Sequence, residues 1–576
     1  MARTNLLLLL YLLAVAASGS ASPCRCFPGD PCWPNESEWA SFNASVGGNL
    51  IATSPIASTC HTDTWFVPYN RQACADLRGN WNNPATHYET SSSPMEPWFT
   101  NFSCSPFTEP STPCTIGPLI RYAVKVSSAT DVERSLKFAK EHNIRLVIRN
   151  TGHDYLGKST GAGSLALWTH HYKPIEHIQQ YNSSWYTGPA LRIGAGVQGF
   201  DALDAAHALN LTLVTGNCPT IGLAGGFTQG GGVGQLSSRF GLAADQVLEW
   251  EVVTADGKIL TVSPSNNADL FWALSGGGGG TFGVVLSVVV RLHPEMATAS
   301  ATLQFTGAAG SIDALFWTVL ETFLVDTLPL LDAGGVSVWS ILPTPGSEAL
   351  TFSVAPLVLP GGTVEQLNGH MASLDMLQRY NTSYSYRVKD FPTFYDSYSN
   401  TTPIVNVSEV YLGGRLIPRS TIATHPSGLI EALHSIARQG AAISGLALNT
   451  SHVPAFPNAV NPSWRETGMS IILGLPVDHI NWQVNLDRQQ RVTRDLVPTL
   501  AAFANADSAY LNEADFNDPY WQSAFYGINF DRLQMIKNKY DPDQLFYART
   551  AVGSQRWEEK LDGRLCMVDP GMKERS

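Results

Sequence analysis

The stretch Arg149-Asn-Thr-Gly-His153-Asp-Tyr155, read together with Gly216-Asn-Cys218-Pro-Thr-Ile-Gly222, decides how this chain folds and what it can hold. Each stretch is a glycine-flanked loop that follows an apolar run, and each offers one nucleophilic side chain. Glycine-rich loops let backbone N–H groups approach an anion or a ring closely. A histidine and a cysteine placed in this way suit a flat, electrophilic cofactor that is held from two sides.

The first residues have the features of a secretory signal peptide. Arg3 precedes an apolar run from Leu6 to Ala17, and small residues follow at 18–22. The run is too short to span a bilayer, and no later window is expected to be long and apolar enough to do so. We therefore expect residues 1–21 to be removed and the protein to be secreted. An uncleaved N-terminal anchor is the alternative.

Secretion changes the interpretation of the nine cysteines, because an oxidising compartment favours disulfides. Seven of them lie within residues 22–114, and Cys566 lies near the other end. These eight can form four disulfides, whose pairing the sequence leaves open. Cys218 is the odd one: a leftover cysteine is paired between chains, chemically occupied, or buried and inert. Its glycine- and proline-rich loop favours chemical occupation.

Charge and glycosylation signals narrow the partners. The formal net charge of −12 and the lack of basic runs argue against nucleic acid and an anionic membrane. A small-molecule substrate fits better, and the oligomeric state is left open. Nine Asn-X-Ser/Thr sequons indicate a glycosylated surface; they begin at Asn35, Asn43, Asn101, Asn182, Asn210, Asn381, Asn400, Asn406 and Asn449.

The length of the chain and its pattern of strand-like and helix-like segments predict an α+β protein with two domains. Residues 22–114 are rich in Cys, Pro, Trp and Asn and are expected to form a disulfide-tied extension wrapped on the surface. Residues 115–295 form the first domain, and residues 296–500 form a second, built on a large antiparallel sheet. Residues 501–576 are expected to return to the first domain.

Apolar periodicity and turn signals give the individual elements. In the first domain we expect strands at 120–126, 146–148, 191–194, 211–214 and 284–292, a hairpin of 247–254 with 258–262, a helix that starts at a capping box at 130–133, and helices at 200–208 and 268–274. Further along we expect strands at 336–342 and 350–358 and helices at 363–380, 428–439 and 526–539.

Three other motifs, which would indicate a dinucleotide-binding unit, a P-loop or a zinc site, are incomplete. Gly194-Ala-Gly196-Val-Gln-Gly199 matches the dinucleotide-binding pattern, but the acidic residue expected about 20 positions later is missing. The glycine runs 222–234 and 276–280 lack the Lys-Ser/Thr of a P-loop. His170, His171 and His177 have no cysteine partners at the short spacings typical of zinc sites, so no metal is expected.

Taken together, these motifs resemble the vanillyl-alcohol oxidase/p-cresol methylhydroxylase flavoprotein superfamily, and more closely its berberine bridge enzyme-like branch. The resemblance covers most of residues 115–555. The cysteine-rich start is similar to secreted fungal members, including isoamyl alcohol oxidase-like proteins. The matching segments are 149–154, 216–226, 240–245, 276–285, 510–513 and 539–546.

The resemblance implies a PCMH-type FAD-binding domain at 115–295, followed by a substrate domain and a berberine bridge enzyme-like tail. It also implies FAD attached to both His153 and Cys218, at the 8α-methyl and C6 positions of the ring. The other residues that it places around the cofactor are Asn150, Thr151, Gly152, Asp154, Gly216, Gly222, Gly225, Gly226, Gly283, Val285 and Asn512.

For catalysis, the resemblance points to the tail motif and leaves the base open. Tyr510 and Glu513 are the first candidates, although Glu513 can also be a structural carboxylate. Plant relatives carry a glutamate base in a strand that matches residues 445–454, where this chain offers only Asn449, Thr450 and His452. His452 is therefore a further candidate base. If Asn449 faces the pocket, its sequon is not glycosylated.

The resemblance also suggests what accepts the electrons. Ile221 falls at the oxygen-gate position, where a β-branched residue favours reaction with O2 and leucine obstructs it. We expect an oxidase that takes a hydride from a C–OH, C–N or C–C centre of an alcohol or secondary metabolite and makes H2O2. One alternative is a carbohydrate oxidase with an aromatic groove of Trp464, Tyr395 and Tyr398. The other is a non-catalytic flavin-carrying protein.

Overall fold

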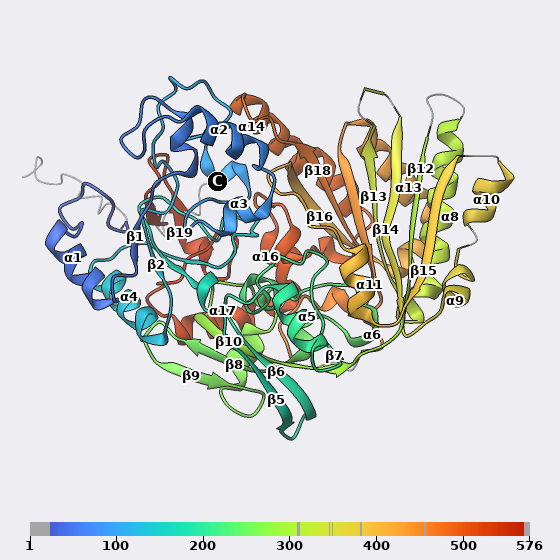
Figure 1. The fold of residues 1–576 in the computed structure, drawn as a ribbon, viewed down its shortest axis with the longest axis horizontal. Coiled ribbons are helices and arrows are strands. Elements are labelled where there is room, and N and C mark those ends of the chain that lie inside the picture. Colours follow the sequence, from blue (N-terminus) through green and yellow to red (C-terminus); the bar gives the residue numbers. More distant parts are fainter. Residues whose placement is uncertain are drawn as a thin grey trace, which may run out of the picture.

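The computed structural model describes residues 24–307, 312–344, 346–347, 349–371, 373–380, 383–453 and 457–568. The expected signal peptide therefore lies outside the described residues. Figure 1 shows a mixed body of helices and small sheets beside a second body, in which one large sheet is flanked by helices. This is the α+β arrangement in two parts that the sequence predicts.

A small, mostly parallel sheet carries the histidine loop. Its strand order is β1-β2-β4-β3, with β2 (Tyr122–Lys125), β4 (Leu165–Trp168) and β3 (Leu146–Arg149) parallel. The extension adds β1 (Leu50–Ala52) antiparallel to β2. The strands predicted at 120–126 and 146–148 are confirmed. Because β3 ends at Arg149, the segment that contains His153 leaves the sheet at its edge.

The helix that connects β2 to β3 starts earlier than predicted. Helix α4 (Ala129–Glu141) has Ser128 as its N-cap, and the carboxylate of Asp131 accepts hydrogen bonds from the backbone N–H groups of Ser127 and Ser128. The predicted capping box of Thr130 and Glu133 is wrong. A shorter acidic side chain three residues after the N-cap closes the same reciprocal arrangement.

A five-stranded antiparallel sheet follows, in the order β5-β6-β10-β8-β9. The predicted hairpin and the strand at 284–292 are confirmed. The Gly194–Gly199 motif follows a strand that pairs antiparallel on both sides, so no parallel nucleotide-binding unit exists here. The elements are β5 (Ile175–Asn182), β6 (Thr187–Gly194), α5 (Gly199–His207), β7 (Leu211–Thr212), α6 (Ser237–Phe240), β8 (Val247–Val253), β9 (Ile259–Val262), α7 (Ala268–Leu274), β10 (Val284–Arg291) and β11 (His293–Pro294).

The second body is a seven-stranded antiparallel sheet in the order β15-β12-β14-β13-β17-β18-β16. Its helices α8 and α13 contact β13 on one face. The helix predicted at 363–380 is interrupted, since α9 ends at Asn368 and α10 begins at Ser373. The strands are β12 (Thr298–Thr306), β13 (Val336–Pro343), β14 (Leu350–Pro360), β15 (Tyr384–Phe391), β16 (Val410–Pro418), β17 (Ala442–Ala447) and β18 (Thr467–Pro476). The helices are α8 (Ile312–Asp332), α9 (Val364–Asn368), α10 (Ser373–Arg379), α11 (Phe394–Thr401), α12 (Arg419–Thr424), α13 (Pro426–Arg438), α14 (Trp482–Arg491) and α15 (Val497–Ala501).

One helix corrects the expectation that no window after the signal peptide is long and apolar enough for a membrane span. Within α8, the stretch Ala314–Asp332 meets that length and composition. Its side chains Phe316, Phe323 and Leu331 belong to the core of the second body, next to strand residues such as Trp339. More than half of the stretch is buried in the fold, as expected for a core helix.

The C-terminal segment packs on the first body. Helix α17 (Phe530–Tyr540) contacts α7, and Phe546 forms a bridge with Leu146 of β3. Lys537 is fully buried and donates to Asp541 at 2.6 Å and to the carbonyl oxygen of Thr281 at 2.7 Å. The tail therefore fastens the chain just after the glycine run at 276–280. The remaining tail elements are α16 (Trp521–Tyr526), β19 (Trp557–Glu559) and β20 (Leu565–Met567).

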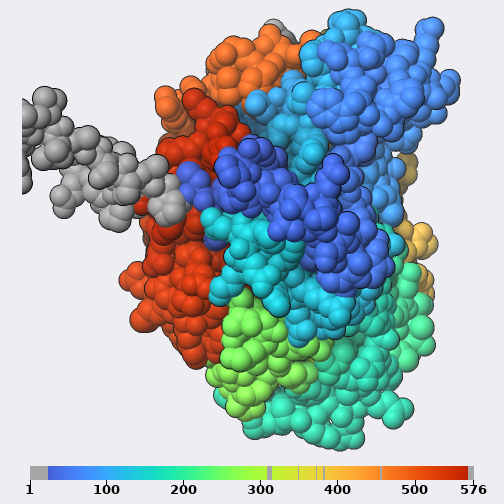
Figure 2. Space-filling view, turned by 90° about the vertical axis from the view of Figure 1, so that its left-hand side faces the viewer, coloured from blue at the N-terminus to red at the C-terminus, as the bar shows by residue number. Residues whose placement is uncertain are grey.

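The N-terminal extension lies on the surface as predicted (Figure 2), except for one stretch that is buried. Its helices α1 (Glu36–Ser45), α2 (Arg71–Gly79) and α3 (Pro84–Tyr88) carry exposed residues, but every residue of Ser91–Pro97 is buried. Composition suggested a solvated loop, because this stretch contains three serines and a glutamate. The structure instead supplies partners for these polar groups inside the molecule.

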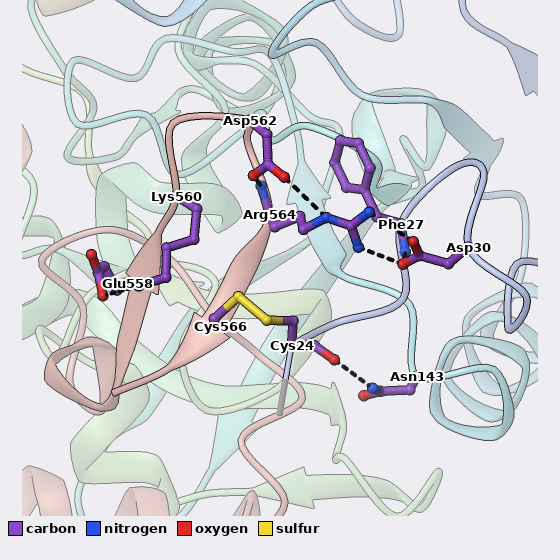
Figure 3. The surroundings of a disulfide bond; sticks show 9 residues. All are labelled: Cys24, Phe27, Asp30, Asn143, Glu558, Lys560, Asp562, Arg564 and Cys566. Atoms are coloured by element: carbon purple, nitrogen blue, oxygen red, sulfur yellow. Dashed lines mark hydrogen bonds and ion pairs between the residues drawn. A yellow bond between two sulfur atoms is a disulfide. The ribbon is translucent and has the colours of Figure 1, made fainter. Parts of the chain in front are cut away.

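The predicted four disulfides are confirmed, and their pairing is now known: Cys24–Cys566, Cys26–Cys32, Cys60–Cys74 and Cys104–Cys114. The first joins the extension to the tail, and Figure 2 shows blue N-terminal residues lying against red C-terminal residues on one face. Beside it, Arg564 pairs with Asp30 at 2.5 and 2.7 Å, and Asn143 donates to the carbonyl oxygen of Cys24 (Figure 3).

Candidate active site

A cavity of about 330 Å³ brings together segments from the whole chain. It is bordered by the loops after β3 and β7, by glycines 279–283, by strands β13, β17 and β18 of the large sheet, and by the tail at 510–513. Every residue that the sequence assigns to the cofactor borders it: Asn150, Thr151, Gly152, His153, Asp154, Gly216, Cys218, Gly222, Gly225, Gly226, Gly283, Val285 and Asn512, together with Ile221.

The two nucleophiles lie side by side in this cavity. His153 Nε2 is 3.9 Å from the Sγ of Cys218, and the hydroxyl of Thr220 lies 2.7 Å from that nitrogen and 3.3 Å from that sulfur. Burial lowers the pKa of His153 to about 4, so its imidazole is neutral at physiological pH. A neutral imidazole is a suitable nucleophile, and a cysteine thiol becomes one when it loses its proton. Cys218 is the one cysteine outside a disulfide.

The histidine loop is shaped by Gly152 and Arg149. Gly152 has φ +83, and a side chain there would meet the guanidinium of Arg149 at 2.8 Å, so only glycine fits. Arg149 is fully buried, and its pKa falls to about 10 because burial disfavours its charge. Asp154 then turns the chain, since its carboxylate accepts from the backbone N–H groups of Leu156 and Ser159.

The cysteine loop packs against the same region. Asn150 donates to the carbonyl oxygen of Ala195, and a side chain added at Gly222 or Gly225 would collide with Asn150. These glycines therefore allow the two loops to touch. On the other side, the hydroxyl of Tyr398 donates to the carbonyl oxygen of Gly216 at 2.7 Å.

Several observations show that the cavity fits FAD. A side chain added at Gly226 or Gly280 would meet no protein atom within 4 Å, so the space in front of both is open to a ligand. Within the described residues, three buried amide oxygens that border the cavity lack a hydrogen-bond partner: Asn150 Oδ1, Asn217 Oδ1 and Gln229 Oε1. The N–H and hydroxyl groups of a flavin with a ribityl chain are donors of the kind these oxygens need.

A cation in the same cavity suits the diphosphate of FAD. Lys158 lies five residues after His153 and borders the cavity. Among the described residues, its Nζ makes no hydrogen bond and no ion pair within 4 Å. Burial lowers the pKa of Lys158 to about 8, and the charge of Asp154 opposes this shift. Lys158 is half-buried, and withdrawing a cation from water without a partner carries a cost that an anionic ligand relieves.

The tail contributes a tyrosine, an amide and a carboxyl group. The amide of Asn512 donates to the hydroxyl of Tyr510 at 2.9 Å and to the carbonyl oxygen of Phe227 at 3.2 Å. Burial raises the pKa of Glu513 to about 7, with a further contribution from Cys218. Burial and the nearby Glu513 hold the pKa of Tyr510 above its usual range. Glu513 is therefore poised to exchange a proton near neutral pH.

The other proposed base does not border the cavity. His452 is exposed in a turn after β17. Asn449 is buried and its amide donates to Asp332 at 2.8 Å, while the hydroxyl of Thr450 donates to the carbonyl oxygen of Trp464. The physical reason is that β17 ends at Ala447, so Asn449, Thr450 and His452 follow the strand rather than lie in it. The buried amide of Asn449 also leaves no room for a glycan.

The aromatic groove expected for a carbohydrate is absent from the described cavity lining. Trp464 and Tyr398 are buried, at 2% and 4% exposure, and Tyr395 stacks on His207 at 4.0 Å between ring centroids. Trp464 instead lies 5.3 Å from the ring of Tyr510, edge on, and so supports the tail tyrosine from behind.

The sequence analysis missed the substrate-side wall. Alternate residues of β17 and β18 face the cavity as Ser444, Leu446, Ser470 and Ile472, whereas Ile443 and Ile471 pack on the helices. This period-two pattern was readable, but the pairing of the two strands was not. Other lining residues missed are Tyr155, Lys158, Phe227, Gln229, Val338, Val405 and Val407.

Comparison with known proteins agrees with this geometry. Residues 120–263 match the family model "FAD binding domain", and residues 509–553 match "Berberine and berberine like". The chain is 46% identical over 559 residues to the FAD-linked oxidoreductase sor8 of Hypocrea jecorina, covering 96% of this chain and 95% of that protein. It is 42% identical to the FAD-linked oxidoreductase patO of Penicillium expansum, covering 98% of both chains.

A solved structure shares the whole fold. The VAO-type flavoprotein MtVAO615 from Myceliophthora thermophila C1 superposes with a TM-score of 0.88 at 38% identity, covering 95% of this chain and 100% of that chain. The berberine bridge enzyme from Eschscholzia californica, at 13% identity and a TM-score of 0.66, shares the fold alone.

Proposed function

The chain belongs to the berberine bridge enzyme-like FAD-linked oxidoreductases, and we propose that it is a secreted oxidase of a small alcohol or secondary metabolite. The bond that it oxidises is C–OH, with C–N or C–C as variants, and O2 is reduced to H2O2. The observation that carries this proposal is the placement of Glu513, a half-buried carboxyl whose pKa is raised to about 7, in the cavity that His153 and Cys218 also border.

His153 and Cys218 would hold FAD covalently, one from each loop. Thr220 engages Nε2 of His153, and within the described residues Nδ1 makes no hydrogen bond, which leaves Nδ1 as the free nucleophilic nitrogen. The chemistry that FAD supplies when bound is acceptance of a hydride, with the electrons then passing to O2.

Residues of the chain would accept the substrate's hydroxyl proton and orient the substrate. Glu513, ionised above pH 7, would accept the hydroxyl proton of the substrate as the hydride leaves carbon. Tyr510 stays protonated and would donate a hydrogen bond, since Asn512 already donates to its oxygen. Ser444 and Ser470 are further hydroxyl groups that border the cavity and would orient a polar substituent.

The lining favours an apolar substrate over an oligosaccharide. Val338, Leu446 and Ile472 form much of the substrate-side wall, and Val405 and Val407 add to it. Sugars need stacking aromatics and many polar partners, whereas this wall buries hydrocarbon. Ile221 borders the cavity, as the proposed oxygen gate requires.

The proposal is tested by a panel of substrates and a colour assay on the holoenzyme. Yellow colour that survives acid precipitation establishes covalent flavin. Peroxide release is then measured with alcohols, oligosaccharides and polyphenols, and we expect it with alcohols or phenolic compounds. Turnover of oligosaccharides alone would make the protein a carbohydrate oxidase. Bound flavin with no turnover of any class would make it a flavin-carrying binding protein.

A further inference from the structure

The buried stretch Ser91–Pro97 connects two walls of the cavity. Connecting segments normally run over the surface, because a buried loop must find partners for all its backbone polar groups. Here, the partners lie in two separate parts of the site. They belong to the histidine loop on one side and to the segment between α11 and β16 on the other.

On the cofactor side, the partner is Arg149. Its Nη2 donates to the carbonyl oxygens of His87 and Ser93 at 3.0 and 2.7 Å, and its Nε donates to that of Thr90 at 3.3 Å. The ring of His87 bonds to the hydroxyl of Ser93 at 2.8 Å and so closes the turn that presents these carbonyls. The extension thus anchors the base of the loop that contains His153.

On the substrate side, the partner is the loop 402–409. The hydroxyl of Ser408 donates to the carbonyl oxygen of Met95 at 2.7 Å, and the backbone N–H of Val407 donates to that of Asn82 at 2.9 Å. The amide of Asn82 also donates to Glu409 at 3.2 Å. These bonds join residues more than 300 positions apart in the chain.

The loop 402–409, which these bonds hold, forms part of the entrance to the cavity. Val405 and Val407 both border the cavity, but Val405 is 44% exposed and Val407 only 4%. The loop therefore runs from the rim to the interior. Ile404, beside Val405, is 61% exposed, so the rim itself is apolar.

We propose that Ser91–Pro97 is a brace behind the active site that positions Val405 and Val407 and thereby sets the size of the apolar substrate admitted. This inference rests on the proposed function only for the claim that a substrate enters here. Ser408 is a positioning residue: it acts through the valines and does not touch the reacting atoms.

The test compares two variants that remove the same sequon, Asn406-Val-Ser408. Ser408→Ala removes the buried bond to Met95, whereas Asn406→Gln keeps that bond and removes only the glycosylation signal and an exposed bond from Asn406 to Glu409. Loss of one hydrogen bond predicts about fivefold faster amide exchange in the peptide that covers residues 402–409 of the holoenzyme. Asn406→Gln should stay within about twofold of the parent. Equal exchange in both variants and the parent would overturn the proposal.

Kinetics test the effect on substrate entry. With any alcohol that the parent oxidises, Ser408→Ala should raise KM severalfold and leave kcat and covalent flavin content near the parent values. A fall in kcat with unchanged KM would contradict a role in positioning the entrance. If Ser408→Ala does not accumulate, Asn82→Ala takes its place, because it removes the bond to Glu409. If even the parent releases no peroxide, the proposed function fails. The exchange comparison still shows whether Ser91–Pro97 holds the loop 402–409 in place.

Discussion

The Nε2 atom of His153 lies 3.9 Å from the Sγ atom of Cys218, although 65 positions separate the two residues along the chain. The hydroxyl of Thr220 contacts both atoms, so one side chain fixes the spacing of two nucleophiles. This places both at the same end of the cavity, where a single ring can meet them together.

Replacing His153 and Cys218 separately and together should show what each residue contributes to covalent attachment of the flavin. His153→Ala and Cys218→Ala should each keep covalent flavin through the remaining bond, and only the double variant should lose it. The measurement is the flavin absorbance of acid-precipitated, redissolved protein. Covalent flavin in the double variant would rule out attachment at these residues.

Glu513→Gln should lower kcat by about 10²–10⁴-fold, the range expected for loss of a general base. In the parent, kcat should rise with pH through about 7, because the acting form is the carboxylate and burial raises its pKa to about that value. The variant should lose this rise. Glu466→Gln, which changes an exposed carboxyl outside the cavity, serves as the control. A parent profile that is flat from pH 5 to 9 would remove Glu513 from this role.

Lys158→Met should reduce the flavin content of the purified protein, because the diphosphate of FAD would lose its nearby positive charge. Lys158→Arg keeps the charge and should restore most of the content. The measurement is the ratio of flavin to protein absorbance, which does not depend on turnover. Full loading of Lys158→Met would show that backbone groups alone bind the diphosphate.

Ile221→Leu should slow reoxidation of the reduced enzyme by O2, while turnover with an artificial electron acceptor changes little. Leucine moves the branch from Cβ to Cγ and so narrows the space beside Gly216, where a Cβ added to the glycine would already meet Ile221 Cδ1 at 3.1 Å. Stopped-flow reoxidation in air-saturated buffer measures the effect. Unchanged reoxidation would mean that O2 reaches the site by another route.

Glu96→Gln should flatten the pH dependence of stability. Burial raises the pKa of Glu96 from 4.5 to about 8, so the folded state binds this proton more tightly than the unfolded state does. Its stabilisation is complete below pH 4.5 and is lost as pH rises towards 8. The melting temperature of the parent should therefore fall by a few degrees more than that of Glu96→Gln between pH 5 and 8. Parallel curves would show that the folded and unfolded states bind this proton equally, as expected for a hydrated carboxyl with an ordinary pKa.

The sequence predicts which residues meet around His153 and Cys218, because the physical requirements there are local. Glycines permit close approach, and each nucleophile sits in its own short loop. The free thiol follows from parity among nine cysteines in an oxidising compartment. Strands such as β3 and β10 are continuous apolar runs, so their pattern identifies them.

The substrate side of the cavity is harder to predict from the sequence, because its lining depends on how distant strands pair. The register of β17 with β18 sets Ser444 opposite Ile472 and Leu446 opposite Ser470, and alternation within either strand does not specify this pairing. His452 illustrates the same limit: a match along the chain placed it in a strand, and the strand ends before it. The buried stretch Ser91–Pro97 is polar, so composition alone puts it in solvent.

The disulfide between Cys24 and Cys566 makes the intervening chain a covalent ring. A single proteolytic cut at any peptide bond between those residues opens the ring without dividing it. A nicked molecule therefore keeps the size of the intact one until it is reduced. A cut in the exposed 403–406 loop would therefore leave the two halves of the chain tethered, and the half that carries both His153 and Cys218 would stay intact.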